Sequence, residues 1–151
     1  MVRGRGRYRG AVPVTPVHVG RRYPAARPYR VSRAKIDEFA AALGDDNPAY
    51  AGHHPIAPPT FAAIIAAQAW GPFFDDPDLD LALQRTMHAD QRFDYTRPLR
   101  AGDEVVATLV IVKVRNRGAT DMITILVEIE TTSGDPVCSA TSTLLHTREA
   151  A

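Results

Sequence analysis

The spacing of hydrophobic positions changes near residue 86. Between residues 32 and 70 the apolar side chains recur at helical spacing, whereas from Thr86 onward they alternate with polar ones, as in half-buried strands. The change divides the chain into a helical first half and a second half of antiparallel strands. With 151 residues, one domain is expected. The pattern therefore predicts an α+β fold in a single unit.

Two helices are expected in the first half. Ser32 is a favourable N-cap, and Gly44 closes the helix that follows it. The second helix begins after Pro58-Pro59-Thr60 and reaches Trp70, where Gly71-Pro72 breaks it. Its apolar positions include Phe61, Ile64 and Ile65 between alanines. This second helix is small enough on several sides to be surrounded by other parts of the structure.

The second half predicts four strands. The first places Met87, Ala89, Gln91, Phe93 and Tyr95 on one face. Three more strands, over residues 104–114, 121–132 and 137–147, are separated by glycine-containing turns. Because the connections are short, we expect the four strands to form an antiparallel meander in chain order. The long strand 105–114 also offers an edge with which another chain can pair.

Charge separates the N-terminus from the rest. Residues 1–36 hold ten of the 18 Lys and Arg and no acid, so the remainder carries 8 basic against 17 acidic residues, a net charge of −9. Arg alternating with Gly cannot bury apolar surface, and residues 1–20 are expected to form a disordered basic tail before a domain over 21–148. Such a tail can bind phosphates or simply be a solvated extension. We consider nucleic acid an unlikely partner.

Composition argues against disulfide-containing, metal-binding, secreted and membrane proteins. The single cysteine, Cys138, excludes an internal disulfide and a cysteine-based metal site, and no spaced cluster of His and carboxylates predicts another metal site. The sequence has neither an apolar span of ~20 residues nor an apolar run after the first arginines that suits a signal peptide. We therefore expect a cytoplasmic protein without a membrane partner.

The stretch between the helices carries the candidate chemistry. It begins with Gly44-Asp45-Asp46-Asn47-Pro48, continues through Tyr50, His53 and His54, and ends with Ala57-Pro58-Pro59-Thr60-Phe61. This stretch resembles the MaoC-like (R)-specific hydratase and dehydratase family, which has the hot-dog fold, a central helix wrapped by a curved antiparallel sheet. The resemblance extends over about residues 20–147 and includes the segment 88–103.

Two departures from the family signature fall on catalytic positions. The family continues Gly-Asp-any-Asn-Pro-apolar with a catalytic His, where this chain has Tyr50, and it begins the central helix with His-Gly, where this chain has Pro58-Pro59. The N-terminal-type subunits of actinobacterial (3R)-hydroxyacyl-ACP dehydratases resemble the chain more closely, since they carry Tyr at the same place and Ala-Pro-Pro-Thr-Phe later. A phenol with a reference pKa of ~10 is a poor base, and Pro59 has no N–H to bind a thioester carbonyl.

Alternative interpretations of the polar residues stay open. Asp45 is a candidate catalytic residue, and either His53 or His54 could replace the missing family histidine. Equally, Asp45 could only stabilise its turn, and the histidines could be ordinary loop residues. The pair His88 and Asp90 also resembles an acid and a base, but a strand-stabilising role is expected for it.

The resemblance implies three hypotheses for function. In the first, the chain binds the acyl group of an acyl-ACP or acyl-CoA thioester, and a hot-dog partner chain with intact Asp and His performs dehydration in fatty-acid or polyketide biosynthesis. In the second, a homodimer works alone with Asp45 and a histidine. In the third, the chain binds thioesters without catalysis. None requires a cofactor. The candidate substrate-binding residues are Tyr50, Pro59, Thr60, Phe61, Ile64, Ile65 and Trp70.

Overall fold

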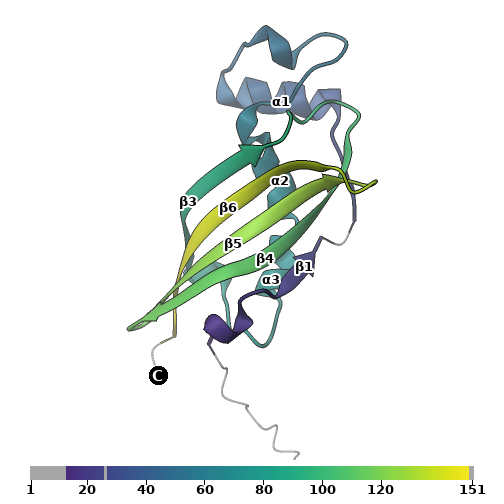
Figure 1. Cartoon of the computed structure of the whole chain (residues 1–151). Coiled ribbons are helices and arrows are strands. Elements are labelled where there is room, and N and C mark those ends of the chain that lie inside the picture. Colours follow the sequence, from purple (N-terminus) through teal and green to yellow (C-terminus); the bar gives the residue numbers. More distant parts are fainter. Residues whose placement is uncertain (1–12, 26, 150–151) are drawn as a thin grey trace, which may run out of the picture.

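The structure, a computed structural model, is an antiparallel sheet of six strands curved around a short central helix (Figure 1). It describes residues 13–25 and 27–149. The strand order is β1-β4-β5-β6-β3, with β2 also paired to β4. The elements are β1 Arg22–Pro24, β2 Tyr29–Arg30, α1 Arg33–Leu43, α2 Ala62–Ala67, α3 Trp70–Phe74, β3 Thr86–Tyr95, β4 Glu104–Arg117, β5 Thr120–Thr131 and β6 Pro136–Thr147. This arrangement confirms the predicted hot-dog fold.

The first helix forms as its end signals predict. The Ser32 side chain accepts a hydrogen bond of 3.1 Å from the backbone N–H of Lys35. Gly44 ends the helix with a φ of 65°, a left-handed conformation that glycine adopts without steric strain. The chain therefore leaves α1 in a defined direction, and the turn that carries Asp45 and Asn47 follows at once.

The central helix is shorter than the sequence predicts. A 3₁₀ turn, Pro59–Phe61, leads into α2, and the helix ends near Gln68 instead of at Gly71-Pro72. Those two residues lie inside α3. The prediction that they break the helix is wrong, because a proline in the first turn of a helix gives up no intrahelical hydrogen bond. Phe61 and Ile65 are buried beneath the sheet.

The predicted meander is only partly correct. Strands β4, β5 and β6 follow one another in the sheet, but β3 pairs with β6 and not with β4. The edge predicted along residues 105–114 is also wrong, because β1 and β2 pair with that side of β4. Within the described residues, β3 pairs with β6 alone, so its other side is the free long edge.

A bulge interrupts β3. The register shifts between His88 and Asp90, so the alternation predicted for residues 87–95 does not hold along the whole strand. Gln91, Phe93 and Tyr95 face the helix side, as their pairing with the inward residues of β6 shows. Met87 and Ala89 are exposed instead. A bulge adds one residue to the strand, so odd-numbered side chains before and after it point to opposite faces of the sheet.

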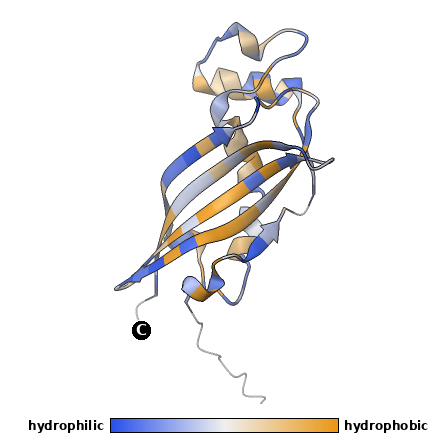
Figure 2. Ribbon diagram, in the orientation of Figure 1, coloured by the Kyte–Doolittle hydropathy of each residue, from blue (hydrophilic) through white to orange (hydrophobic). Residues whose placement is uncertain are grey.

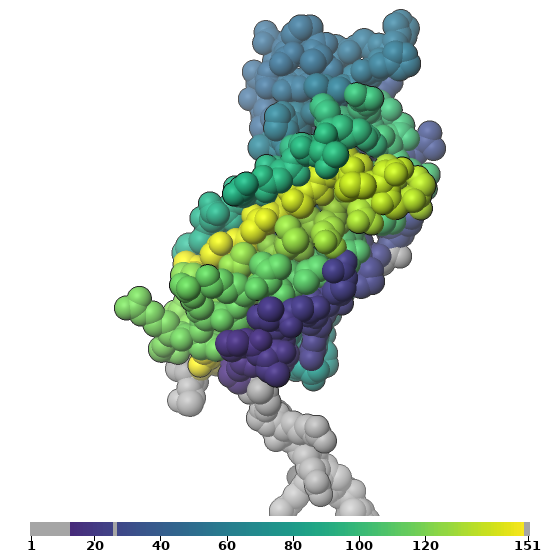
Figure 3. Space-filling view, viewed as in Figure 1, coloured from purple at the N-terminus to yellow at the C-terminus, as the bar shows by residue number. Residues whose placement is uncertain are grey.

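Residues 13–20 pack against the domain, in contrast to the predicted tail boundary at residue 20. Val14 is fully buried, and its N–H donates to the carbonyl of Leu79 at 3.1 Å. Gly20 donates to the carbonyl of Ile111 at 2.8 Å. This purple segment lies against the base of the sheet in Figure 3. The ordered domain therefore begins earlier than composition indicates, whereas the prediction for residues 1–12 lies outside the described residues.

None of the described helices has the length and apolar character needed to cross a membrane.

Candidate functional site

A cavity of about 460 Å³ opens where the chain enters the central helix. Three segments form it: the turn after α1, the approach to α2 and the end of β3. The proximity of these segments follows from the fold, because β3 lies on the sheet edge beside the helix entry. The lining residues are Asn47, Tyr50, Ile56, Ala57, Pro59, Tyr95, Thr96, Arg97 and Pro98.

Tyr50 is the polar side chain of this cavity that stands at the family's catalytic position. It lies in the 3₁₀ turn Pro48–Tyr50, where the Asn47 side chain accepts from the N–H of Ala49 at 3.0 Å, and it is only 8% exposed. Burial raises the pKa of the Tyr50 phenol, and the negative charge of Asp45 raises it further. The phenol therefore stays protonated near neutral pH and can donate a hydrogen bond, but it cannot act as a base.

Pro59 and Tyr95 form the wall at the helix entry. The Tyr95 phenol donates a hydrogen bond to the Pro59 carbonyl. Burial is the main cause that raises the pKa of Tyr95, so this donor is also neutral. At the place where the family provides a backbone N–H, this chain presents a proline ring and a carbonyl that is already engaged. The neighbouring Thr60 is exposed.

Arg97 brings a positive charge to the cavity, but an ion pair with Asp103 of the same chain neutralises it. Its guanidinium donates to both carboxylate oxygens of Asp103, at 2.7 and 3.1 Å. Asp103 also accepts from the backbone N–H of Arg100 at 2.8 Å. The ion pair closes the turn between β3 and β4, and it leaves the cavity predominantly apolar.

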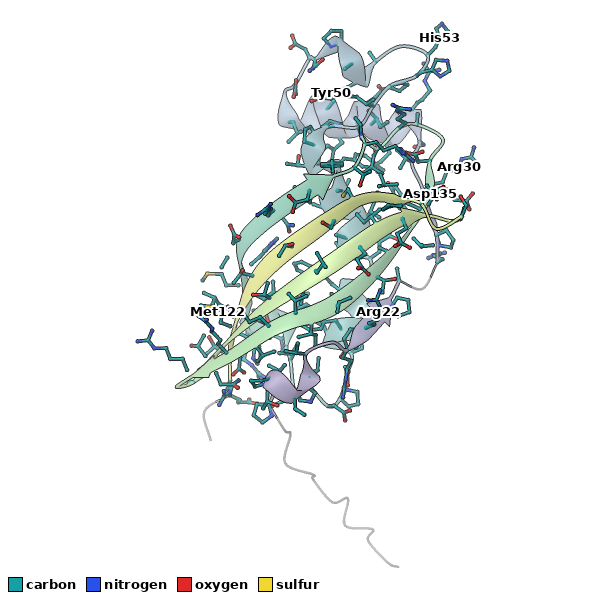
Figure 4. The ribbon with its side chains drawn as sticks, in the orientation of Figure 1. Arg22, Arg30, Tyr50, His53, Met122 and Asp135 are labelled. Atoms are coloured by element: carbon teal, nitrogen blue, oxygen red, sulfur yellow. The ribbon has the colours of Figure 1, made fainter. Side chains whose placement is uncertain are left out.

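Asp45 and the two histidines do not line the cavity. Asp45 is exposed and accepts from the backbone N–H of Asn47 at 3.1 Å, a bond that stabilises its own turn. His53 and His54 are exposed in the loop that follows, and Figure 4 shows His53 at the end of this loop, away from the sheet. Among the described residues, no hydrogen bond joins either histidine to Asp45. The catalytic role of these three residues stays a prediction.

Apart from Thr60, which is exposed, the predicted substrate-binding residues fall into two groups. Tyr50 and Pro59 line the cavity. Phe61 and Ile65 are buried core residues, and the Phe61 ring packs edge to face against Phe39 with centroids 5.3 Å apart. Trp70 packs against the ring of His88 at 5.2 Å, and Ile64 is half-buried against the core. None of the second group lines the cavity.

The sequence did not single out the β3 side of the cavity. Tyr95 to Pro98 lie almost forty residues after Pro59, and only the pairing of β3 at the sheet edge brings them together. The available signal was the family-like segment 88–103, which contains all four of these residues.

An antiparallel sheet wrapped around a central helix defines the hot-dog class, and in this chain an apolar cavity lies at the helix entry. The chain belongs to the MaoC-like hot-dog dehydratase family: residues 17–140 match the family model described as FAS1-like, dehydratase domain region.

The relatives are close in sequence. A UPF0336 protein of Cutibacterium acnes is 54% identical over 130 residues, which cover 86% of this chain and 92% of the relative. A UPF0336 protein of Streptomyces coelicolor is 43% identical over 136 residues, covering 84% and 91%.

Solved structures share the fold. The HadBC (3R-hydroxyacyl-ACP dehydratase) complex of Mycobacterium tuberculosis superimposes with a TM-score of 0.76 at 27% identity, covering 85% of this chain and 96% of that one. The ChsH1-ChsH2 complex from the same organism matches in fold, with a TM-score of 0.60 at 20% identity, covering 87% and 85%.

Proposed function

We propose that this chain is a subunit of a (3R)-3-hydroxyacyl-thioester dehydratase, in which it binds the acyl chain while a second hot-dog chain supplies the catalytic Asp and His. The observation that carries the proposal is the cavity at the helix entry, which has Tyr50 and Pro59 where the family has its base and its N–H donor. A cavity that is apolar but lacks a base suits binding better than proton transfer.

The reaction itself needs only acid–base groups. A base removes the α-proton of the 3-hydroxyacyl thioester, an acid protonates the departing β-hydroxyl, and water leaves with no change in oxidation state. Hydrogen-bond donors at the thioester carbonyl stabilise the charge that develops there. In this chain the neutral phenol of Tyr50 can donate to an oxygen of the substrate, but no lining residue is a suitable base. The missing step therefore falls to a partner.

Two further observations support a partner chain. The free edge of β3 lies next to the cavity, since Tyr95 belongs to both. The HadBC dehydratase, which shares the fold, is a complex. We propose that a hot-dog partner with the intact Asp and His signature pairs with this chain and that the acyl thioester is carried on acyl carrier protein or coenzyme A.

The test compares the chain alone, the candidate partner alone and the two together, with crotonyl and longer enoyl thioesters as substrates for hydration. We expect activity only in the mixture. Asp45→Asn, or His53→Ala combined with His54→Ala, should change the rate of the complex only modestly, whereas replacing the partner's catalytic His should cost about 10²–10⁴-fold.

The opposite result would identify a self-sufficient enzyme. If the purified chain alone hydrates enoyl thioesters at ordinary enzyme rates, the proposal is wrong. Loss of that activity in Asp45→Asn, or in His53→Ala combined with His54→Ala, with the fold retained, would then identify the changed residues as catalytic. Thioester binding without turnover in any mixture would instead favour a binding protein.

A further inference from the structure

The outer face of the sheet, which is turned away from α2, carries opposite charges at its two ends. Side chains of β4 and β5 alternate between the buried inner face and this outer face. In Figure 2 the hairpin end of β4 and β5 is blue, whereas the middle of both strands is orange. The outer face includes the apolar residues Val110, Val112, Met122 and Leu126. An apolar centre between charged ends is a common composition of interfaces.

The basic end is the β4–β5 hairpin. Lys113, Arg115 and Arg117 are exposed, and within the described residues none of them forms an ion pair. The hairpin projects beyond the body of the molecule in Figure 3. Three cations that repel one another on a projecting hairpin are favourably placed to meet an acidic surface.

The acidic end is a hollow of about 330 Å³ at the opposite end of the same strands. Asp94, Glu128 and Glu130 line it. Glu128 is 2.5 Å from Arg22 and Asp94 is 2.8 Å from Arg92, while Glu130 has no ion-pair partner in the described part of the chain. Two of its three carboxylates are already paired, so the acidic character of the hollow rests on Glu130.

The basic hairpin and the acidic hollow are separated along the strands by a distance that one strand sets. Arg115 lies opposite Met122 of β5, and Glu128 follows Met122 by six residues, or about 20 Å. A two-fold axis that runs parallel to the sheet and perpendicular to its strands, near Leu126, places the hairpin of each copy over the hollow of the other. Packing of two sheets face to face with nearly aligned strands is a common arrangement.

From these observations we infer that the outer face is a self-association surface for a second copy of this chain, with the basic hairpin of each copy seated in the acidic hollow of the other. The contact also covers Val112 and Met122, which are 40% and 43% exposed in the single chain. It uses the face of the sheet and leaves the edge of β3 free. The hollow nevertheless shares Tyr95 and Thr96 with the cavity of the proposed function, so the test uses the chain without a catalytic partner.

The test uses two charge-reversed variants of the full chain, studied by sedimentation equilibrium. The first, Lys113→Glu with Arg115→Glu, makes both ends acidic; the second, Asp94→Lys with Glu130→Lys, makes both ends basic. Each variant alone should form particles with half as many chains as the wild type. Its association constant should fall about tenfold or more, because like charges then face each other. An equimolar mixture of the two should recover the association of the wild-type chain.

The control is Arg27→Glu with Arg33→Glu, which changes the net charge by the same amount as the first variant, at exposed positions away from the outer face. It should associate as the wild type does, and added salt should weaken the wild-type association. If both variants and the control show the same mass as the wild type, or if the mixture fails to recover it, the outer face is not a self-association surface.

Discussion

At the scale of single residues, Tyr50 and Pro59 decide what this chain can do in its own cavity. Burial and the charge of Asp45 raise the pKa of the Tyr50 phenol, so it titrates above its ordinary range. Pro59 cannot donate a backbone hydrogen bond at all. Both residues therefore favour holding a ligand over moving its protons.

Replacing Tyr50 tests this interpretation. Tyr50→Phe keeps the ring but removes the hydroxyl, and we expect the shape of the pH profile of kcat/KM for the active complex to stay unchanged, because the phenol is protonated across the neutral range. Tyr50→Ala should raise KM and destabilise the chain by about 3 kcal/mol through the space that it opens. Loss of one limb of the pH profile in the Phe variant would show that the phenol transfers protons.

At the scale of elements, a buried cluster around Asp121 joins the β4–β5 hairpin to the end of β6. Asp121 is fully buried, and Arg148 donates to its two oxygens at 2.9 and 3.0 Å from Nε. Asn116 donates to the same carboxylate at 2.6 Å and to the Val14 carbonyl at 2.8 Å. The Nδ1 atom of His146 is 3.5 Å from the carboxylate. One carboxylate thus orders several segments.

The cluster predicts a specific dependence of stability on pH. Burial would raise the pKa of Asp121, but the hydrogen bonds from Arg148 and Asn116 outweigh it and the pKa is lowered. The stabilisation is therefore fully present above the ordinary aspartate pKa of ~3.9 and is lost as the pH falls through the lower folded value. Asp121→Asn should cost about 2–3 kcal/mol near pH 7, and the cost should shrink in acid.

Denaturant unfolding of both proteins between about pH 3 and pH 7 measures this difference. Asp37→Asn, an exposed carboxylate on α1, is the matched control and should change little at any pH. A constant difference between wild type and Asp121→Asn across the range would mean that the charge of Asp121 contributes nothing.

Two truncations test where the ordered domain begins. A chain that starts at Arg21 loses the buried Val14 side chain and the hydrogen bonds of Val14 and Gly20, so we expect it to be about 2–4 kcal/mol less stable. A chain that starts at Pro13 should be nearly as stable as the full chain, as the composition of residues 1–12 predicts. Equal melting temperatures for the two truncations would contradict this boundary.

At the scale of the whole molecule, the free edge of β3 predicts that the chain is not a monomer in its working state. The unpaired side of this ten-residue strand presents backbone donors and acceptors that another strand can satisfy. Pairing there would also bring a second chain next to the cavity, because Tyr95 ends the same strand.

Hydrogen exchange can detect this pairing. In a free edge, those β3 amides that do not bond to β6 should exchange quickly, whereas addition of the partner chain should slow them. Buried amides of β5 serve as the internal reference, since their exchange should not change. Fast exchange in β3 in a stable complex would place the interface elsewhere.

The sequence alone determined the features that depend on local rules. Ser32 and Gly44 set the limits of α1 because capping acts over a few residues, and the β-branched runs identified β4, β5 and β6 through their alternation. The motif from Gly44 to Phe61 indicated the family. The resemblance to that family also singled out Tyr50 and Pro59, the two residues that the cavity shares with the predicted site.

Only the tertiary structure decided the features that depend on distant contacts. Strand order placed β3 beside β6 and joined Tyr95 to Pro59, which no spacing in the chain indicates. The bulge at His88 turned Met87 outward, and the buried place of Val14 depends on the loop near Leu79 and on Asn116. Such contacts join residues far apart in sequence, and their free energy exists only once the chain has closed around the helix.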